Sequence, residues 1–496
     1  MIDKLKQLSK ETVVYGISTV VGRFLNFVLV PFYSNIFNPA DMGVMANLYA
    51  YMAIFNIVFI YGMDSAYLKM GSLKESNGST RVFTTSYMTI LLSTAVFSIL
   101  LFLSKPWLGI SVSADPAVVA KYEHLISFSI NILALDALTV LPFIYLRLQN
   151  KAMTFSKIRV INILINIGMN FILVLGFKMG VEAVFISNLI ASGYSFLALM
   201  PYVYENLSTD YDFSLLKRIL KFGLPFLPAG MAAMLMQVID KPIVERLTNL
   251  DTLGIYNANY KLGIFMMLFV SMFQFAWQPF FLKHASDDNA RQLFARVFTY
   301  FTIAGSIIVV FLSLFIEDIT AIGFGGVHFL GEAYWGGRNI IPVILLGYLF
   351  YGFYVNFNAS FYIKEKSIPI PVLLGAGAVV NVGLNFLLIP LMGIMGAALA
   401  TLGSYVVISG FFFWYGRKLF EIDYEFRKIF SILGLITVVF IIYYSFISGQ
   451  EVSFFIKLLI ALGFVVSIIF TGALSLREIK VMKDMITGFT GRFRSK

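Results

Sequence analysis

Charged side chains inside long apolar stretches are the residues of this sequence most able to do chemistry. Arg23 lies near the middle of the first such stretch, and Thr19 and Asn26 share its face at spacings of four and three residues. A guanidinium group in lipid is costly unless it faces a cavity, a carboxylate or an anionic ligand. Arg23 and Asn26 are therefore candidates for binding an anionic substrate. The alternative is an ion pair between Arg23 and Asp136.

Two polar residues in neighbouring stretches bear on that choice. Asn56 is expected at the depth of Arg23 on the second apolar stretch, so this hairpin offers Arg23 an amide rather than a carboxylate. Asp136 lies in the middle of NILALDALTV, where an unpaired carboxylate is unfavourable. Asp136 is thus either the counter-ion of Arg23 or a site for a proton or cation.

A second group of charges brackets the turn predicted near Leu250. Asp240, Lys241 and Lys261 fall at about the same depth on the two sides of this turn. An ion pair between Asp240 and Lys261 is the simplest account, since it neutralises both groups. The competing interpretation places Lys261 in a cavity, where its ammonium group would meet substrate.

Asparagines form a stripe along one later stretch. Asn162, Asn166 and Asn170 recur every four residues and so share a helix face, and Asn381 and Asn385 repeat the pattern near the other end of the chain. Amide side chains at such spacing bridge helices in lipid. The stripe is predicted either to pack helices together or to line a sugar-binding cavity.

Signals of soluble enzymes are mostly absent from the sequence. No G-x-x-x-x-G-K-[ST] phosphate loop is present, and the chain has no cysteine. The three histidines, His124, His284 and His328, are too far apart in sequence for metal-ligand spacing. We therefore expect no enzymatic activity, no catalytic residues, no metal site and no cofactor.

The elements that carry these residues are long and apolar. Hydrophobic residues make up 59% of the 496 and charged residues 13%, about half the charged share of a soluble domain. Stretches of about 20 apolar residues recur throughout, each long enough to cross a bilayer. We predict an all-α polytopic membrane protein with about 14 transmembrane helices. The predicted spans lie near residues 12–37, 41–67, 82–104, 119–146, 155–176, 181–204, 219–246, 253–280, 293–316, 338–363, 369–390, 394–415, 428–448 and 453–475.

A duplicated motif organises these spans into two halves. NIGMNFILVLGFKMG from Asn166 returns as NVGLNFLLIPLMGIMG from Asn381, on the fifth and eleventh spans. An even separation makes the halves parallel repeats. DMGVMANLY, at residues 41–49, and TLGIYNANY, at 252–260, agree more weakly. The predicted divisions are an N-lobe at 1–204, a cytoplasmic linker helix at 205–218, a C-lobe at 219–418, two further spans at 419–475 and a basic cytoplasmic tail at 476–496.

The basic residues predict the orientation. A cytoplasmic N-terminus puts most of the 37 Lys and Arg residues on the cytoplasmic side, as the positive-inside rule requires. Both termini are then cytoplasmic, and the longest outer loop runs from Glu317 to about Gly337. The basic residues form no single patch, so we expect no nucleic-acid partner.

Three segments carry a family resemblance: the duplicated N-x-G-x-N-F motif with its MGIMGAALAT ending, the segment DFSLLKRILKFGLPFLPAGM, and FLGEAYWGGRNIIPVILLGYLFYG. Over essentially the whole chain the sequence resembles the bacterial polysaccharide-export flippases. These share a superfamily with the multidrug and toxin extrusion antiporters and the peptidoglycan-precursor flippase.

The resemblance implies a flippase of the bacterial inner membrane. Its cargo would be an undecaprenyl-diphosphate-linked oligosaccharide for surface polysaccharides such as O-antigen, moved to the outer leaflet by alternating access. Relatives expose cationic residues to a central cavity in the first and eighth spans, the positions of Arg23 and Lys261 here. It further implies membrane lipids, and a polysaccharide polymerase with other assembly proteins, as partners.

Two rival functions fit less well. A cation-coupled multidrug antiporter of the same superfamily would have acidic cavity residues and about 12 spans. A membrane glycosyltransferase or polysaccharide polymerase would need catalytic residues on a sizeable outer loop, which the sequence lacks.

Overall fold

The computed structural model describes residues 27–72, 80–113, 115–366 and 368–473, and this part of the chain is nearly all helical. Within these described ranges, twelve helices are long and apolar enough to cross a membrane, and α20 (Phe454–Phe470) is a shorter apolar helix. These thirteen helices correspond to the second to fourteenth predicted spans. Of the first predicted span the described part is residues 27–37, with 27–34 helical. The predicted class, an all-α polytopic membrane protein, is confirmed.

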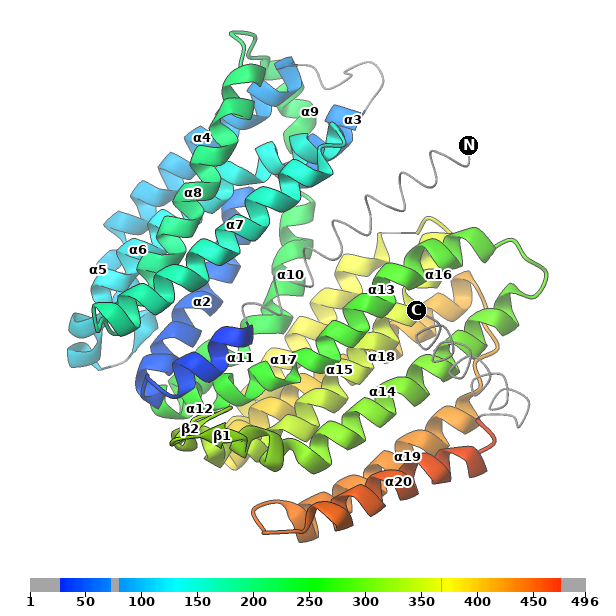
Figure 1. Cartoon of the computed structure of the whole chain (residues 1–496). Helices are drawn as coiled ribbons and strands as arrows, with labels where there is room; N and C mark the ends of the chain where they lie inside the picture. Colours follow the sequence, from blue (N-terminus) through cyan, green and yellow to red (C-terminus); the bar gives the residue numbers. More distant parts are fainter. Residues whose placement is uncertain (1–26, 73–79, 114, 367, 474–496) are drawn as a thin grey trace, which may run out of the picture. The chain divides into compact units, whose positions relative to one another are not determined.

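The chain divides into two compact units (Figure 1). The first unit comprises Met1–Ile264, Gly323–Gly337 and Ser367–Ile408. The predicted lobes follow the sequence repeat instead, so this division does not test them. Elements that lie in or begin in the first unit are α2 (Pro39–Ile60), α3 (Met63–Ser72), α4 (Thr80–Leu103), α5 (Lys105–Val112), α6 (Pro116–Leu148), α7 (Ala152–Phe171), η1 (Ile172–Gly176), α8 (Glu182–Asn206), α9 (Phe213–Gly223), α10 (Phe226–Val238), α11 (Asp240–Leu247), α12 (Leu250–Tyr260), η2 (Lys261–Gly263), β1 (Gly323–Phe324), β2 (Val327–His328), η3 (Glu332–Ile340), α17 (Pro369–Met392) and α18 (Ile394–Leu419).

The second unit comprises Phe265–Ile322, Arg338–Lys366 and Ser409–Lys496. Its helices α19 and α20 lie side by side (Figure 1). Besides α20, its elements are α13 (Ile264–His284), α14 (Ala290–Ala321), α15 (Ile341–Phe357), α16 (Ala359–Ile363), α19 (Phe426–Ile442) and η4 (Tyr443–Ile447).

Short polar residues set the beginnings of several helices. Asn38 caps α2 by accepting the backbone N–H of Asp41 at 2.8 Å, and Asn249 caps α12 by accepting that of Thr252 at 2.8 Å. A break separates α10 from α11 at Ile239. Pro242 explains this break, because its ring lacks an N–H and clashes with the carbonyl group four residues earlier.

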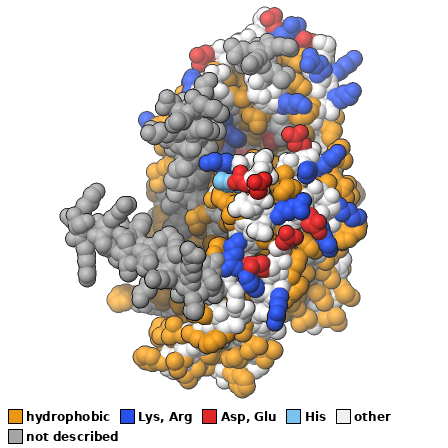
Figure 2. Space-filling model, turned by 90° about the vertical axis from the view of Figure 1, so that its right-hand side faces the viewer, with side chains coloured by type: hydrophobic (Ala, Val, Ile, Leu, Met, Phe, Trp, Pro, Cys, Tyr) orange, Lys and Arg blue, Asp and Glu red, His pale blue; other side chains and the backbone are white. Residues whose placement is uncertain are grey.

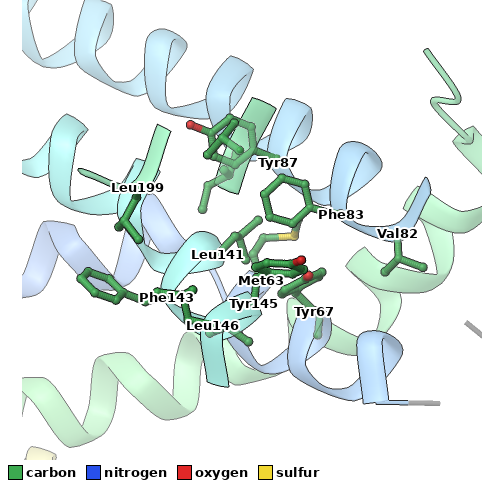
Figure 3. Close-up of a cluster of buried hydrophobic side chains, with 14 of the residues drawn as sticks. Met63, Tyr67, Val82, Phe83, Tyr87, Leu141, Phe143, Tyr145, Leu146 and Leu199 are labelled. Carbon is green, nitrogen blue, oxygen red and sulfur yellow. The ribbon is translucent and has the colours of Figure 1, made fainter. Parts of the chain in front are cut away.

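A cluster of buried side chains joins α3, α4, α6, α7, α8 and α9 (Figure 3). Phe83 is at its centre, with ring centroids 5.8 Å from Tyr67, 5.5 Å from Tyr87 and 5.8 Å from Tyr145. Each aromatic pair adds about 1 kcal/mol beyond area burial. Since lipid is as apolar as these rings, such specific packing is what holds the helices together.

The second unit has an aromatic core and an ion pair whose lysine is buried. Phe298 of α14 packs against Phe353 and Phe357 of α15, with centroids 4.8 and 5.0 Å apart. The Lys457 ammonium, only 3% exposed, lies 2.6 Å from Asp318 Oδ2 and ties α20 to α14.

Charged and apolar side chains separate on the surface. One face gathers Lys, Arg, Asp and Glu side chains, while hydrophobic side chains fill the lower part of the same view (Figure 2). Large apolar side chains stand exposed on several helices, including Leu103, Val379 and Phe470 at 74%, 73% and 85%. A helix with so much exposed apolar surface requires lipid as its surroundings.

The region predicted as the longest outer loop has structure of its own. α14 extends to Ala321, and β1 and β2 then form an antiparallel hairpin with Gly323 opposite His328. The turn residues Gly325 and Gly326 have φ of +62° and +83°, which a tight two-residue hairpin turn requires and glycine permits. The 3₁₀ helix η3 follows and leads into α15.

Candidate functional site

Asp240 and Lys241 lie at the break between α10 and α11, where both side chains are buried. The Lys241 ammonium is 3.2 Å from Asp240 Oδ1 and 3.3 Å from the carbonyl oxygen of Gln237. Tyr256 of α12 donates its hydroxyl to Asp240 Oδ2 at 2.6 Å. Both carboxylate oxygens of Asp240 are therefore occupied by residues of the first unit.

Lys261 occupies a second helix irregularity. It begins η2, the 3₁₀ segment between α12 and α13, and a mid-helix 3₁₀ stretch often marks a functional hinge. Its ammonium interacts repulsively with that of Lys241, which itself lies 4.6 Å from the ring centroid of Tyr260. Two lysines therefore approach each other at neighbouring breaks, while Asp240 neutralises only one of them.

The simplest account of Lys261 from sequence was an ion pair with Asp240. The structure instead pairs Asp240 with Lys241 and Tyr256. Within the described part of the chain, no carboxylate lies within 4.0 Å of the Lys261 ammonium. An ion pair between Asp240 and Lys261 is therefore not what this structure contains.

Asp136 lies on α6, and its carboxylate contacts α8. Its Oδ1 accepts the hydroxyl of Ser192 at 2.7 Å. The basic group that interacts with it is Arg159 of α7, whose guanidinium lies 4.3 Å from the centroid of Phe143. Sequence reasoning missed Arg159, which lies only two turns inside α7.

The other candidate substrate residues are described only in part. Arg23 and Asn26 lie outside the described residues, so the predicted pairing of Arg23 with Asp136 stays a prediction. Asn56 is half-buried on α2, and its side chain makes no hydrogen bond within the described ranges.

The asparagine stripe makes hydrogen bonds within and between helices. Asn162 of α7 donates to the carbonyl oxygen of Ala191 at 2.6 Å and to Ser195 Oγ at 2.9 Å, both on α8. In the second copy, Asn381 of α17 donates to Ser404 of α18 at 3.1 Å. These bonds bridge consecutive helices in both repeats.

The last asparagine of each stripe makes the same bond. Asn170 and Asn385 each donate to the carbonyl oxygen four residues earlier, Asn166 and Asn381, at 2.8 Å. Both are fully buried. At this position the copies differ, because Tyr33 donates its hydroxyl to Asn170 Oδ1 at 2.8 Å whereas Asn385 Oδ1 has no partner in the described chain.

Sequence reasoning gave no role to a close crossing of α2 and α12. A Cβ on Gly43 would overlap the carbonyl oxygen of Leu250, and one on Gly254 would overlap that of Pro39. The only signal was the weak similarity between residues 41–49 and 252–260, which places the two glycines opposite each other.

Comparison with known proteins assigns the chain to a family. The polysaccharide biosynthesis protein family matches residues 34–327, more than half of the chain. The chain belongs to this family. The resemblance seen in the sequence is thereby confirmed. No curated protein matches the chain at a significant level.

Solved structures of membrane transporters share the fold. The lipid II flippase MurJ in an inward closed conformation is 16% identical with a TM-score of 0.70, covering 92% of this chain and 98% of that one. An inward-facing multidrug resistance MATE family transporter of the MOP superfamily is 12% identical with a TM-score of 0.68, covering 80% and 94%. A MOP superfamily transporter from Pyrococcus furiosus is 15% identical with a TM-score of 0.53, covering 82% and 95%. This polysaccharide biosynthesis protein therefore has the fold of MOP superfamily transporters.

Proposed function

We propose that this protein is a flippase that moves an undecaprenyl-diphosphate-linked oligosaccharide from the cytoplasmic to the outer leaflet, for cell-surface polysaccharide synthesis. Its family and its fold support the proposal. The observation that carries it is Lys261, a lysine at a helix break for which the described chain supplies no carboxylate within 4.0 Å. An anionic substrate provides the missing counter-charge.

The chemistry of a diphosphate fits this arrangement. A lysine in the middle of a membrane-spanning helix costs roughly 3 kcal/mol, and carrying a diphosphate through lipid is costly in the same way. Bringing the two together offsets both costs, because charge-assisted hydrogen bonds form as solvent is lost. Arg23 would add a second cation from the first span, with Asn26 and Asn56 as neutral donors to phosphate or sugar. No bond is made or broken.

The proposed mechanism is alternating access between the two repeats. The N-lobe at 1–204 rocks against the C-lobe at 219–418, and the linker at 205–218 joins them at the cytoplasmic face. The breaks at Ile239 and η2 lie beside the proposed site, and discontinuous helices commonly line transporter sites. Backbone groups freed at such breaks are tolerated where they face protein or a cavity.

The proposal also includes the membrane in which the protein lies, its orientation there and its partners. The protein lies in the bacterial inner membrane with both termini in the cytoplasm, as its basic residues predict. Asp136 is the candidate site for a coupling proton or cation, held by Ser192. A polysaccharide polymerase and other assembly proteins are the expected partners on the outer side.

A second candidate function is cation-coupled export of drugs. The likeness in fold to the multidrug transporter and the acidic Asp136 in α6 favour it. Deleting the gene distinguishes the two: a flippase deletion stops surface polysaccharide, whereas a drug exporter deletion raises drug sensitivity and leaves the polysaccharide intact.

The deciding experiment replaces Lys261 by Gln and by Arg and follows the outer-leaflet appearance of lipid-linked oligosaccharide in reconstituted vesicles. We expect Lys261→Gln to lose roughly tenfold or more and Lys261→Arg to stay within about threefold, since charge-assisted hydrogen bonds are worth about 1.5–3 kcal/mol. Lys283→Gln, at the exposed end of α13, is the matched control and should transport normally. Undiminished transport by Lys261→Gln would remove this residue from the site. Arg23→Ala and Arg23→Lys form the parallel test on the first span.

A further inference from the structure

The segment Gly323–Gly337 packs with the first unit although the helices before and after it, α14 and α15, belong to the second. Its contacts reach the turn at residues 33–38, between the first span and α2. Asn35 donates to the carbonyl oxygen of His328 at 2.6 Å and accepts the backbone N–H of His328 at 3.0 Å. This reciprocal pair joins residues 293 positions apart.

Three further hydrogen bonds continue the contact. The backbone N–H of Gly331 donates to Ser34 Oγ at 3.0 Å, and the hydroxyl of buried Tyr334 donates to the carbonyl oxygen of Phe37 at 2.7 Å. Asn259 of α12, also buried, donates to the carbonyl oxygen of Tyr334 at 2.8 Å. The segment is thus bonded to residues of both repeats.

Close approach of the two backbones shows that the fit is specific. A Cβ on Gly331 would overlap the carbonyl oxygen of Ser34, so no larger residue fits without moving the segment. The ring of Phe329 lies 6.0 Å from that of Phe27, and Leu330 is fully buried. Polar and apolar contacts together cover the turn at 33–38.

We propose that Gly323–Gly337 is a latch that fastens the second repeat to the turn at residues 33–38. The latch holds the outer side closed and releases in each transport cycle. The need for release rests on the proposed function, because rocking of the two lobes separates residues 33–38 from the second repeat. The contacts between the latch and the turn do not depend on the proposed function.

The sequence contains no cysteine, so a pair of introduced cysteines can form a disulfide only with each other within the chain. In the variant Asn35→Cys/His328→Cys, oxidation links the latch to the turn. The control, Phe324→Cys/Val327→Cys, links the two strands of the hairpin and leaves the latch free to lift. We expect the oxidised latch variant to lose at least tenfold in transport and to recover on reduction, while the control stays within about twofold. Failure of the latch cysteines to cross-link, or normal transport by the linked protein, would overturn the proposal.

A second measurement needs no substrate. Asn259→Cys places a single thiol beneath the latch, and its labelling by a membrane-impermeant thiol reagent from the outer side reports release. Adding Tyr334→Phe, which removes one latch hydrogen bond, should raise the labelling rate about fivefold, since one hydrogen bond of about 1 kcal/mol corresponds to that factor. Adding Asn35→Ala, which removes two, should raise it further. Adding Asn131→Ala, whose amide bonds only within α6, should not change it. Unchanged labelling in the latch variants refutes the latch, whereas latch effects without oligosaccharide transport refute only the proposed function.

Discussion

Gly43 of α2 and Gly254 of α12 lie back to back, so that a Cβ on Gly254 would come within 3.0 Å of the Gly43 backbone nitrogen. The contact is self-complementary. Gly43 faces the carbonyl oxygen of Leu250, and Gly254 faces that of Pro39, at one constant offset of 211 residues between the repeats. The caps Asn38 and Asn249 keep the same offset. The two repeats thus meet here through equivalent backbone surfaces.

This crossing predicts that Gly43→Ala and Gly254→Ala are both destabilising and by similar amounts. The added methyl group meets backbone on the facing helix, which cannot rotate away, and overpacking of this kind costs roughly 1–3 kcal/mol. Thermal unfolding of the detergent-purified protein measures the effect as a fall in Tm. Gly193→Ala in α8, where a Cβ meets nothing within 4 Å, is the control and should be neutral or slightly stabilising. Equal Tm values for all three variants would contradict the crossing.

The buried pair of Asp240 and Lys241 predicts strong non-additivity. Lys241→Met leaves a buried carboxylate, and Asp240→Asn leaves a buried ammonium, so each single change should cost about 3 kcal/mol. The double variant removes both charges and should cost clearly less than the sum. Unfolding of the four proteins gives the coupling energy. Additive effects would mean that the pair is not formed.

The long apolar helices could be predicted because lipid imposes long apolar runs, and a charge such as that of Lys261 stands out against such a run. The partner of Lys241 could not. Neighbouring residues on a regular helix point apart, so the contact between Asp240 and Lys241 in the first turn of α11 has no signal in the sequence spacing. The bond from Tyr256 depends on the packing of α12 against α11, which no sequence spacing encodes.

The contact between the turn at 33–38 and Gly323–Gly337 could not be predicted from the sequence either. Its hydrogen bonds to the turn each join a side chain to a backbone group, so one partner of each leaves no side-chain pattern in the sequence. The role of the asparagine stripe was left open between packing and a cavity, because spacing gives the shared face and not what lies opposite. Asn381 donating to Ser404 places another helix opposite that residue.

The hydrogen bond between Asn381 and Ser404 should contribute modestly to the stability of the protein, and the contribution should be lost when either residue is replaced. Asn381→Ala and Ser404→Ala should each lower stability by roughly 0.6–1 kcal/mol, the usual range for hydrogen bonds between membrane helices. Because both changes remove the bond between these two side chains, the double variant should cost less than the sum of the singles. Asn381→Ala also removes the bond that Asn385 donates to Asn381 Oδ1 at 3.0 Å, so it should be the costlier single change. Tm measurements on the singles and the double test this. Thr437→Ala serves as a control, since its hydroxyl bonds only within α19.

Asp212 predicts a pH-dependent stability at the start of α9. Its carboxylate accepts the Ser214 hydroxyl at 2.7 Å and the backbone N–H of Leu215 at 3.1 Å, and Arg81 lies 3.0 Å away. These contacts, the Ser214 hydroxyl foremost, lower the pKa of Asp212 below its ordinary value. A lowered folded-state pKa means that the stabilisation is complete at neutral pH and is lost as pH falls through the folded pKa.

We therefore expect Asp212→Ala to lower Tm by the same amount at pH 6, 7 and 8. The difference from the unaltered protein should shrink below about pH 4, where the unfolded carboxyl group takes up its proton. Asp210→Ala is the control, because the Asp210 carboxylate accepts no hydrogen bond within the described residues and its removal should leave Tm unchanged at every pH. A Tm difference for Asp212→Ala that stays constant down to pH 3 would show that the charge of this cap does not stabilise α9.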